Sequence, residues 1–232
     1  MSPARCVQPE TLDYLAEDDP RAVRSRADLR RIHRIMGTRA IMLRALRDSI
    51  APRRIIELGA GDGTLMLALA QRLAHHWPHV CLTLLDRQSL IAPATIGAFH
   101  ALGWQLDIVN ADVLDWIRQP ASGRYDLMTA ALFVHHFDEA QLALLLPAVA
   151  ERTDAFFACE PRRARLALAG SHLIGLIGAN AVTREDAVLS VRAGFTDKEL
   201  TALWPQQASG WRLQEYAAGL FSHCFFALRQ RE

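Results

Sequence analysis

Two adjacent histidines stand in the stretch Ala131-Leu132-Phe133-Val134-His135-His136-Phe137-Asp138. Histidine titrates near neutral pH, so either imidazole is suited to take a proton from a hydroxyl group. His135 and His136 are therefore candidate catalytic bases, with His135 expected to face a pocket and His136 expected to be structural. The alternative is that one of them caps the next helix or bonds to buried backbone.

A second chemical signal is the segment Glu57-Leu58-Gly59-Ala60-Gly61-Asp62-Gly63-Thr64, in which every second residue after the acid is glycine. Glycine has no Cβ, so such a loop lets the backbone pass very close to a ligand. Thr64 occupies the third glycine position of the G-x-G-x-x-G dinucleotide fingerprint, and the G-K-[ST] ending of a triphosphate loop is missing. The alternative is a tight turn that binds nothing.

Two further acids follow apolar runs that are expected to be strands. Asp86 ends one run, and an acid at that place can accept hydrogen bonds from both hydroxyls of a ribose. Asp112 opens the segment Asp112-Val113-Leu114-Asp115-Trp116 and is also a typical N-cap for a following helix. In doubly wound sheets, ligands bind outside the carboxyl ends of the strands, where these acids would lie.

The elements that must position these residues alternate along the chain. Near-continuous apolar runs indicate strands that are covered on both faces, and their alternation with helical segments indicates a parallel sheet. We predict strands at 53–59, 79–86, 105–110, 125–132 and 154–160, and helices at 63–75, 90–102, 112–119 and 138–152.

The chain around this alternating core falls into three further segments. Residues 1–52 are expected to be helical, with a break at Gly37, and to lie on the substrate side as a lid. Residues 53–161 form the cofactor-binding core. Residues 162–205 are a mainly helical insertion on the substrate side, and residues 206–232 contribute a β-hairpin that completes the core.

The glycine segment, with a strand before it and a helix after it, resembles motif I of class I S-adenosylmethionine-dependent methyltransferases. By order of elements the resemblance extends over about residues 53–230, although only the first third carries a specific motif. It implies a Rossmann-like α/β fold with a doubly wound, mostly parallel seven-stranded sheet and an antiparallel C-terminal hairpin. It also implies S-adenosyl-L-methionine as cofactor, with S-adenosyl-L-homocysteine as product.

The resemblance assigns roles to individual positions. The glycine loop passes under the methionine part of the cofactor, and the acid before it, Glu57, helps to anchor the amino group of the methionine part. Asp86 holds the ribose, and Asp112 takes the adenine amino group. The cofactor-binding residues that we predict are Glu57, Gly59, Ala60, Gly61, Asp62, Gly63, Asp86, Arg87, Asp112, Val113 and Ala131.

The histidine stretch is similar to an L-x-H-H-x-D pattern that many small-molecule methyltransferases carry beside the transferred methyl group. Methyl transfer is an in-line displacement, so the protein must mainly align the acceptor and exclude water. The apolar stretch LALAGSHLIGLIG and the arginines near it favour a small aromatic, polyketide-like or isoprenoid acceptor, methylated at oxygen or carbon. The predicted substrate-binding residues are Phe133, Glu160 and Arg163, and the similar branches are those of quinone biosynthesis and bacterial secondary metabolism.

Composition excludes several other classes. The formal net charge of +1 over 232 residues gives no overall attraction to nucleic acid or membrane. The four cysteines have no C-x-x-C spacing, so we predict no metal site and a reducing, cytoplasmic location. The first 20 residues do not have the pattern of a signal peptide.

Two other functions remain open. Arginines near the N-terminus suggest a methyltransferase of RNA or protein, but the chain lacks the [DN]-P-P-[YF] and Pro-Cys signatures of two nucleic-acid chemistries. A non-catalytic cofactor-binding partner subunit is the third possibility. We expect a small-molecule acceptor, no nucleic-acid partner, no membrane span, and a monomer or homodimer.

Overall fold

The computed structural model describes residues 3–47, 51–121, 123–205 and 210–230. Parts of three predicted segments therefore lie outside the described residues: 1–2 and 48–50 in the N-terminal segment, 122 in the core, and 206–209 and 231–232 in the C-terminal segment. Within the described ranges, no helix is both long enough and apolar enough to cross a membrane.

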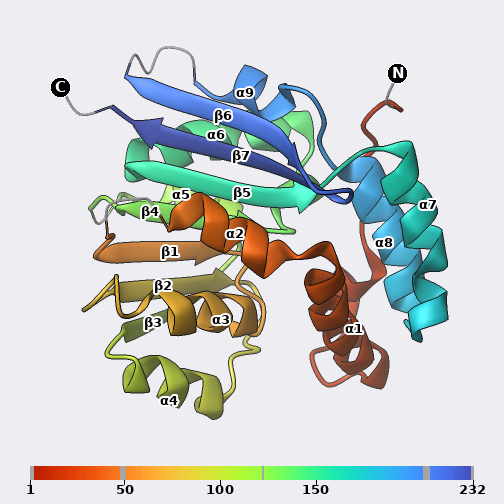
Figure 1. Ribbon diagram of the computed structural model, residues 1–232, viewed down its shortest axis with the longest axis horizontal. Helices are drawn as coiled ribbons and strands as arrows, with labels where there is room; N and C mark the ends of the chain where they lie inside the picture. Colours follow the sequence, from red (N-terminus) through yellow and green to blue (C-terminus); the bar gives the residue numbers. More distant parts are fainter. Residues whose placement is uncertain (1–2, 48–50, 122, 206–209, 231–232) are drawn as a thin grey trace.

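A seven-stranded sheet forms the centre of the molecule, with the strand order β3-β2-β1-β4-β5-β7-β6. The first five strands are parallel, and the pairings of β5 with β7 and of β6 with β7 are antiparallel. This confirms the predicted fold, including the C-terminal hairpin (Figure 1). The strands are β1 (Arg54–Leu58), β2 (Cys81–Asp86), β3 (Gln105–Asn110), β4 (Leu127–Ala131), β5 (Ala155–Pro161), β6 (Trp211–Ala218) and β7 (Ser222–Arg229).

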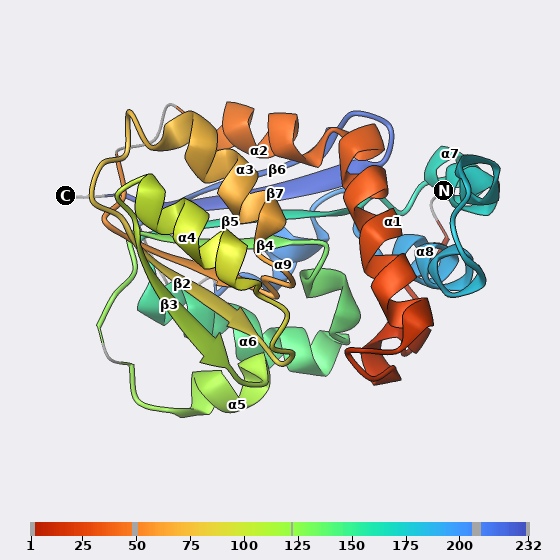
Figure 2. The same ribbon diagram turned by 90° about the horizontal axis from the view of Figure 1, so that it is seen from below.

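Helices cover both faces of this sheet, as Figure 2 shows from the side. Adjacent strand residues point to opposite faces, so Ile55 packs into one core cluster with Phe99 of α4, while Ile56 packs into the other with Leu145 of α6. One face carries α2 (Thr38–Leu46), α3 (Thr64–Leu73) and α4 (Pro93–Ala101), and the other α5 (Val113–Arg118), α6 (Glu139–Arg152) and α9 (Glu199–Leu203).

Local sequence signals set the helix boundaries. Gly37 has a left-handed backbone (φ 69°) and separates α1 (Pro20–Met36) from α2, as predicted. Asp138 and Gln141 form a reciprocal capping box at the start of α6. Asp112 caps α5 by accepting the Leu114 N–H at 2.7 Å.

A separate layer lies beyond the carboxyl ends of the parallel strands. It contains α1, α7 (Arg165–Leu173) and α8 (Ala181–Ala193), which gather at one end of the sheet in both views (Figures 1 and 2). Because α1 precedes the core and the other two helices follow β5, segments far apart in the sequence together cover the carboxyl end of the sheet. Short 3-10 turns occur at Thr11–Tyr14, Val134–His136 and Ile174–Ile177.

Candidate functional site

The glycine loop between β1 and α3 has the tight geometry that its sequence predicts. Gly59, Gly61 and Gly63 all have positive φ angles, of 68°, 55° and 70°. A Cβ at Gly59 would lie 2.1 Å from Cδ2 of Phe133, so the loop has no space for a side chain there. At Gly63, a Cβ would instead lie 3.1 Å from Cδ1 of Leu84 in the core.

A cavity of about 580 Å³ lies at the carboxyl ends of the strands, in front of this loop. Its wall brings together most of the residues that were predicted to bind a cofactor. From the predicted set, it contains Glu57, Gly59, Ala60, Gly61, Asp62, Asp86, Arg87, Asp112, Val113, Ala131, Phe133, His135 and His136. Gly63, Glu160 and Arg163 are not part of this wall.

Glu57 presents a buried carboxyl group to the cavity. The residue is 3% exposed, and its Oε2 atom has no hydrogen-bond partner among the described residues. Burial, followed by the negative charges of Asp86 and Asp62, raises the pKa of Glu57 to about 8. A carboxyl group of this kind favours a cationic ligand, because the ligand's charge would restore the interaction that burial removes.

The other acids of the cavity wall are held by backbone groups. Asp86 accepts the Gly61 N–H at 2.8 Å and the Gln88 N–H at 2.9 Å, which fixes its carboxylate beside the glycine loop. Asp112 is a helix cap that also lines the cavity, so its two predicted roles are compatible. Arg87 turns toward the N-terminus and pairs with Asp13 at 2.8 Å.

Glu160 lies underneath the histidine loop. It is completely buried, and its carboxylate accepts the backbone N–H groups of Phe133, Val134 and His135 at 3.0–3.3 Å. Leu132, just before these three, has a left-handed backbone with φ 52°, which is unusual for a branched side chain. The carboxylate thus holds a strained loop in place, and the structure gives Glu160 this position instead of the substrate contact that was expected.

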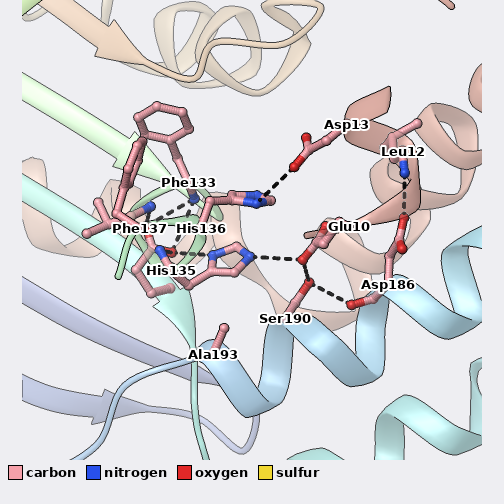
Figure 3. Close-up of polar contacts among 12 residues, drawn as sticks. Glu10, Leu12, Asp13, Phe133, His135, His136, Phe137, Asp186, Ser190 and Ala193 are labelled. Atoms are coloured by element: carbon pink, nitrogen blue, oxygen red, sulfur yellow. Dashed lines mark hydrogen bonds and ion pairs between the residues drawn. The ribbon is translucent and has the colours of Figure 1, made fainter. Parts of the chain in front are cut away.

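The two histidines of that loop differ in burial. The His135 side chain is 2% exposed; its Nδ1 lies 2.7 Å from Glu160 Oε2, and its Nε2 lies 3.4 Å from Glu10 Oε1. Burial by itself lowers the pKa of His135, but the nearby carboxylates of Glu10 and Glu160 outweigh burial and raise the pKa to about 9. The His136 side chain is 25% exposed, and its Nδ1 lies 3.4 Å from Asp13 Oδ2 (Figure 3).

Glu10 and Asp13 belong to an N-terminal strap, which we define as residues 3–14. Asp186 of α8 holds the strap by accepting the N–H groups of Thr11 and Leu12 at 2.8 and 3.0 Å. The strap also donates the Cys6 N–H to the carbonyl of Arg192 at 3.1 Å.

Arg5 adds further hydrogen bonds between the strap and the histidine loop. Its Nη2 donates to the carbonyls of His135 and Phe137 at 3.1 and 2.8 Å. The strap belongs to the segment 1–52, which was expected to be a helical lid on the substrate side. No motif marks Glu10 or Asp13, and only their acidic character was visible in the sequence.

Arg163 serves the packing of the same region. It is 4% exposed, donates to the carbonyl of Pro3 at 2.7 Å, and forms an ion pair with Glu199. Protein groups therefore occupy the Arg163 guanidinium, and it does not lie in the cavity wall, where the predicted contact with substrate would be. Of the three predicted substrate residues, Phe133 alone lines the cavity.

A smaller cavity of about 150 Å³ adjoins the first one. It lies among α1, α7, α8 and the turn at Phe221, and aliphatic side chains such as Ile32, Ile35 and Ile174 make up much of its wall. The apolar stretch of α7 thus contributes to a pocket wall, as expected. Six residues belong to the walls of both cavities: Glu10, Leu12, Leu29, Leu132, Pro161 and Ser190.

No protein-family model matches the sequence, and a search of curated proteins finds no match. Among solved structures, the chain is similar to an O-methyltransferase family protein from Burkholderia thailandensis (16% identity, TM-score 0.60, covering 92% of this chain and 61% of that one). It is similar to the pyocyanin biosynthetic protein PhzM (19% identity, TM-score 0.62, covering 95% and 62%). It also resembles the plantazolicin methyltransferase BamL, solved with a triazolic desmethylPZN analogue and S-adenosylhomocysteine (12% identity, TM-score 0.65, covering 95% and 94%).

These similarities establish a shared fold. The chain spans 61% and 62% of the first two proteins but 94% of the third. The sheet order and the C-terminal hairpin are therefore those of the solved methyltransferases.

Proposed function

We propose that the protein transfers the methyl group of S-adenosylmethionine to an oxygen or carbon atom of a small, largely apolar molecule. The observation that carries this proposal is the buried Glu57 carboxyl group, whose Oε2 lacks a partner within the described chain and which faces a cavity of about 580 Å³. It stands beside a glycine loop in a fold shared with methyltransferases solved with S-adenosylhomocysteine.

The residues of the cavity fit this cofactor group by group. Glu57 would take the ammonium group, Gly59 and Gly61 would pass under the methionine part, and Asp86 would accept hydrogen bonds from the ribose hydroxyls. Asp112 would take the adenine amino group. When bound, S-adenosylmethionine supplies an electrophilic methyl group on a sulfonium.

The smaller cavity is the proposed place for the acceptor. Its aliphatic wall favours an apolar molecule, and the residues that it shares with the larger cavity support binding of the two ligands side by side. Phe133 and the two histidines line the larger cavity, and we assign His135 or His136 to removing the proton of a hydroxyl acceptor. The small-molecule chemistry of the structural neighbours PhzM and BamL supports this class of acceptor.

Calorimetric titration with S-adenosylhomocysteine tests the cofactor assignment. We expect micromolar binding by the wild-type protein. Asp86→Ala should weaken binding by on the order of 1.5–3 kcal/mol, because it removes charge-assisted hydrogen bonds. The matched control is Asp115→Ala, since Asp115 is exposed and pairs only with Arg118 within the described residues. If the wild type does not bind, or if both variants bind equally, the assignment fails.

The absence of a nucleic-acid partner stays a prediction, and the charges of α1 support it. Three of its six arginines form ion pairs with nearby acids, which reduces the free basic charge of this helix: Arg21 with Asp19, Arg30 with Asp62, and Arg31 with Asp28. RNA binding with a steep salt dependence would contradict this prediction. A monomer or homodimer in the cytoplasm also remains our expectation.

A further inference from the structure

We infer that Glu10, His135 and His136 form a binding site for a divalent metal ion, and that this ion is Zn²⁺. One potential ligand atom from each residue lies within 4.8 Å of the other two. The three side chains converge from the N-terminal strap and the histidine loop (Figure 3). From the cysteine spacing no metal site was predicted, and nothing in the sequence places Glu10 beside the two histidines.

The atom that points most directly to a ligand is Nε2 of His135. It is buried and has no hydrogen-bond partner within the described residues, although Glu10 Oε1 lies 3.4 Å away. Zinc binds imidazole nitrogen and carboxylate oxygen at about 2.0–2.2 Å, so two ligands of a tetrahedral ion lie about 3.3–3.5 Å apart. The observed separation agrees with two atoms that share an ion.

The surroundings of His135 prepare Nε2 to be a metal ligand. Glu160 lies 2.7 Å from Nδ1, so this carboxylate can accept the Nδ1–H and leave the lone pair on Nε2. A carboxylate on the distal nitrogen is the usual support of a metal-binding histidine. Nε2 would then face the Glu10 carboxylate, and two acceptors at this distance repel one another unless a proton or a metal ion lies between them.

His136 distinguishes a metal ion from a shared proton. A proton between His135 and Glu10 would satisfy two atoms, whereas the structure gathers a third candidate ligand from His136. Asp13 lies 3.4 Å from His136 Nδ1 and supports this ring much as Glu160 supports the first. Two imidazoles and one carboxylate are a donor set that suits zinc, with a fourth position open for water or a ligand.

A metal ion bound at this position would have two effects. Glu10 belongs to the walls of both cavities, and His135 and His136 line the larger one, so the open position would face the boundary between the cavities. An acceptor oxygen could complete the coordination there; this step rests on the proposed methyltransferase function. The ion would also fasten the strap to the histidine loop. Both His135 and His136 would then be ligands, in place of the base assigned above.

The test is metal binding itself. Purified protein is stripped with a chelator, dialysed, titrated with Zn²⁺ in a calorimeter, and assayed for bound zinc by elemental analysis. We expect one zinc ion per chain. Glu10→Gln and His136→Ala should each weaken binding by about tenfold or more, since each removes a ligand. His135→Ala changes a buried side chain, so circular dichroism checks whether this variant keeps the wild-type fold.

A matched control comes from a second pair of adjacent histidines, His75 and His76, which are exposed on the surface. The double variant His75→Ala/His76→Ala should bind zinc as the wild type does. If the wild type binds no zinc, or if this control loses binding as much as Glu10→Gln and His136→Ala do, the inference is overturned. A proton-only bridge would appear as the first of these results.

Titration of the stripped protein with S-adenosylhomocysteine separates this inference from the proposed function. Cofactor binding without zinc binding would remove the metal site and leave the cofactor assignment intact. Zinc binding without cofactor binding would support the metal site and contradict the cofactor assignment.

Discussion

The carboxyl group of Glu57 combines burial with contact to a cavity, and this combination makes cofactor binding depend on pH. Its pKa of about 8 means that Glu57 is mostly protonated at pH 7 in the free protein. An ammonium group beside it would favour the carboxylate, so binding should release close to one proton per chain at pH 7 and almost none at pH 9. Calorimetry in two buffers with different ionisation enthalpies measures this release.

Glu57→Gln provides the control for that experiment, because the amide cannot titrate. The variant should bind more weakly and release no proton. The same group affects the free protein: its folded-state pKa lies above the ordinary value of 4.5, so its contribution to stability is complete below about pH 4.5 and is lost as the pH rises toward 8. Wild type and variant should therefore differ in the slope of the unfolding free energy over this range, and equal slopes would contradict the assignment.

Gly59 is the position where the loop tolerates least change. Gly59→Ala should abolish detectable binding of S-adenosylhomocysteine, because the new Cβ would overlap the Phe133 ring and the φ angle of 68° is strained for alanine. Gly37→Ala is the matched control: its φ angle is 69°, but a Cβ there meets nothing within 4 Å. It should cost on the order of 1–3 kcal/mol of stability and leave binding unchanged. Equal binding by the two variants would refute this account.

At the scale of elements, the side chain of Asp186 holds two consecutive backbone N–H groups of the N-terminal strap. Asp186→Ala removes the acceptor of the Thr11 and Leu12 N–H groups, each of which makes a charge-assisted hydrogen bond. Hydrogen exchange in residues 3–14 should become at least about tenfold faster, while the sheet keeps its protection. The comparison is Glu185→Ala, which changes an exposed neighbour. Unchanged exchange in the strap would show that its other contacts suffice.

The strap also shows which part of the structure could not be predicted from the sequence. The alternating core was predictable, because apolar runs, helix caps and Gly37 act over a few residues and fix local structure. Glu10 joins the site through contacts with residues far away in the sequence, such as Ser190 of α8, which is 180 residues away, and no local pattern encodes these contacts. The same limit explains Glu160: its position after β5 was visible in the sequence, but its role as acceptor for three backbone N–H groups was not.

For the molecule as a whole, the adjoining cavities make a prediction about selectivity. Ala187 lines the smaller cavity and does not line the larger one. Ala187→Phe should therefore fill part of the acceptor pocket. Methylation of apolar acceptors should fall by about tenfold or more, because an acceptor that fits less deeply buries less apolar surface. Affinity for S-adenosylhomocysteine should stay within about twofold. A panel of aromatic acceptors measures the first effect, and a parallel loss of cofactor affinity would contradict the division of roles.

The topology explains how much of the site could be found from the sequence. Parallel strands bring their carboxyl ends to one edge, so Glu57, Asp86 and Asp112 had to meet there once the strand assignments were right. All three line the larger cavity. Arg163 was placed with the substrate because its nearness to β5 was known, but its partners Pro3 and Glu199 come from elsewhere in the chain.

The strap has a further consequence for how the protein is made. In the order of synthesis the strap precedes the groups that hold it, and 175 residues separate Thr11 from its acceptor Asp186. The strap must therefore stay undocked until α8 has been made. The histidine site is then completed only after the synthesis of α8, later than the glycine loop and the first five strands.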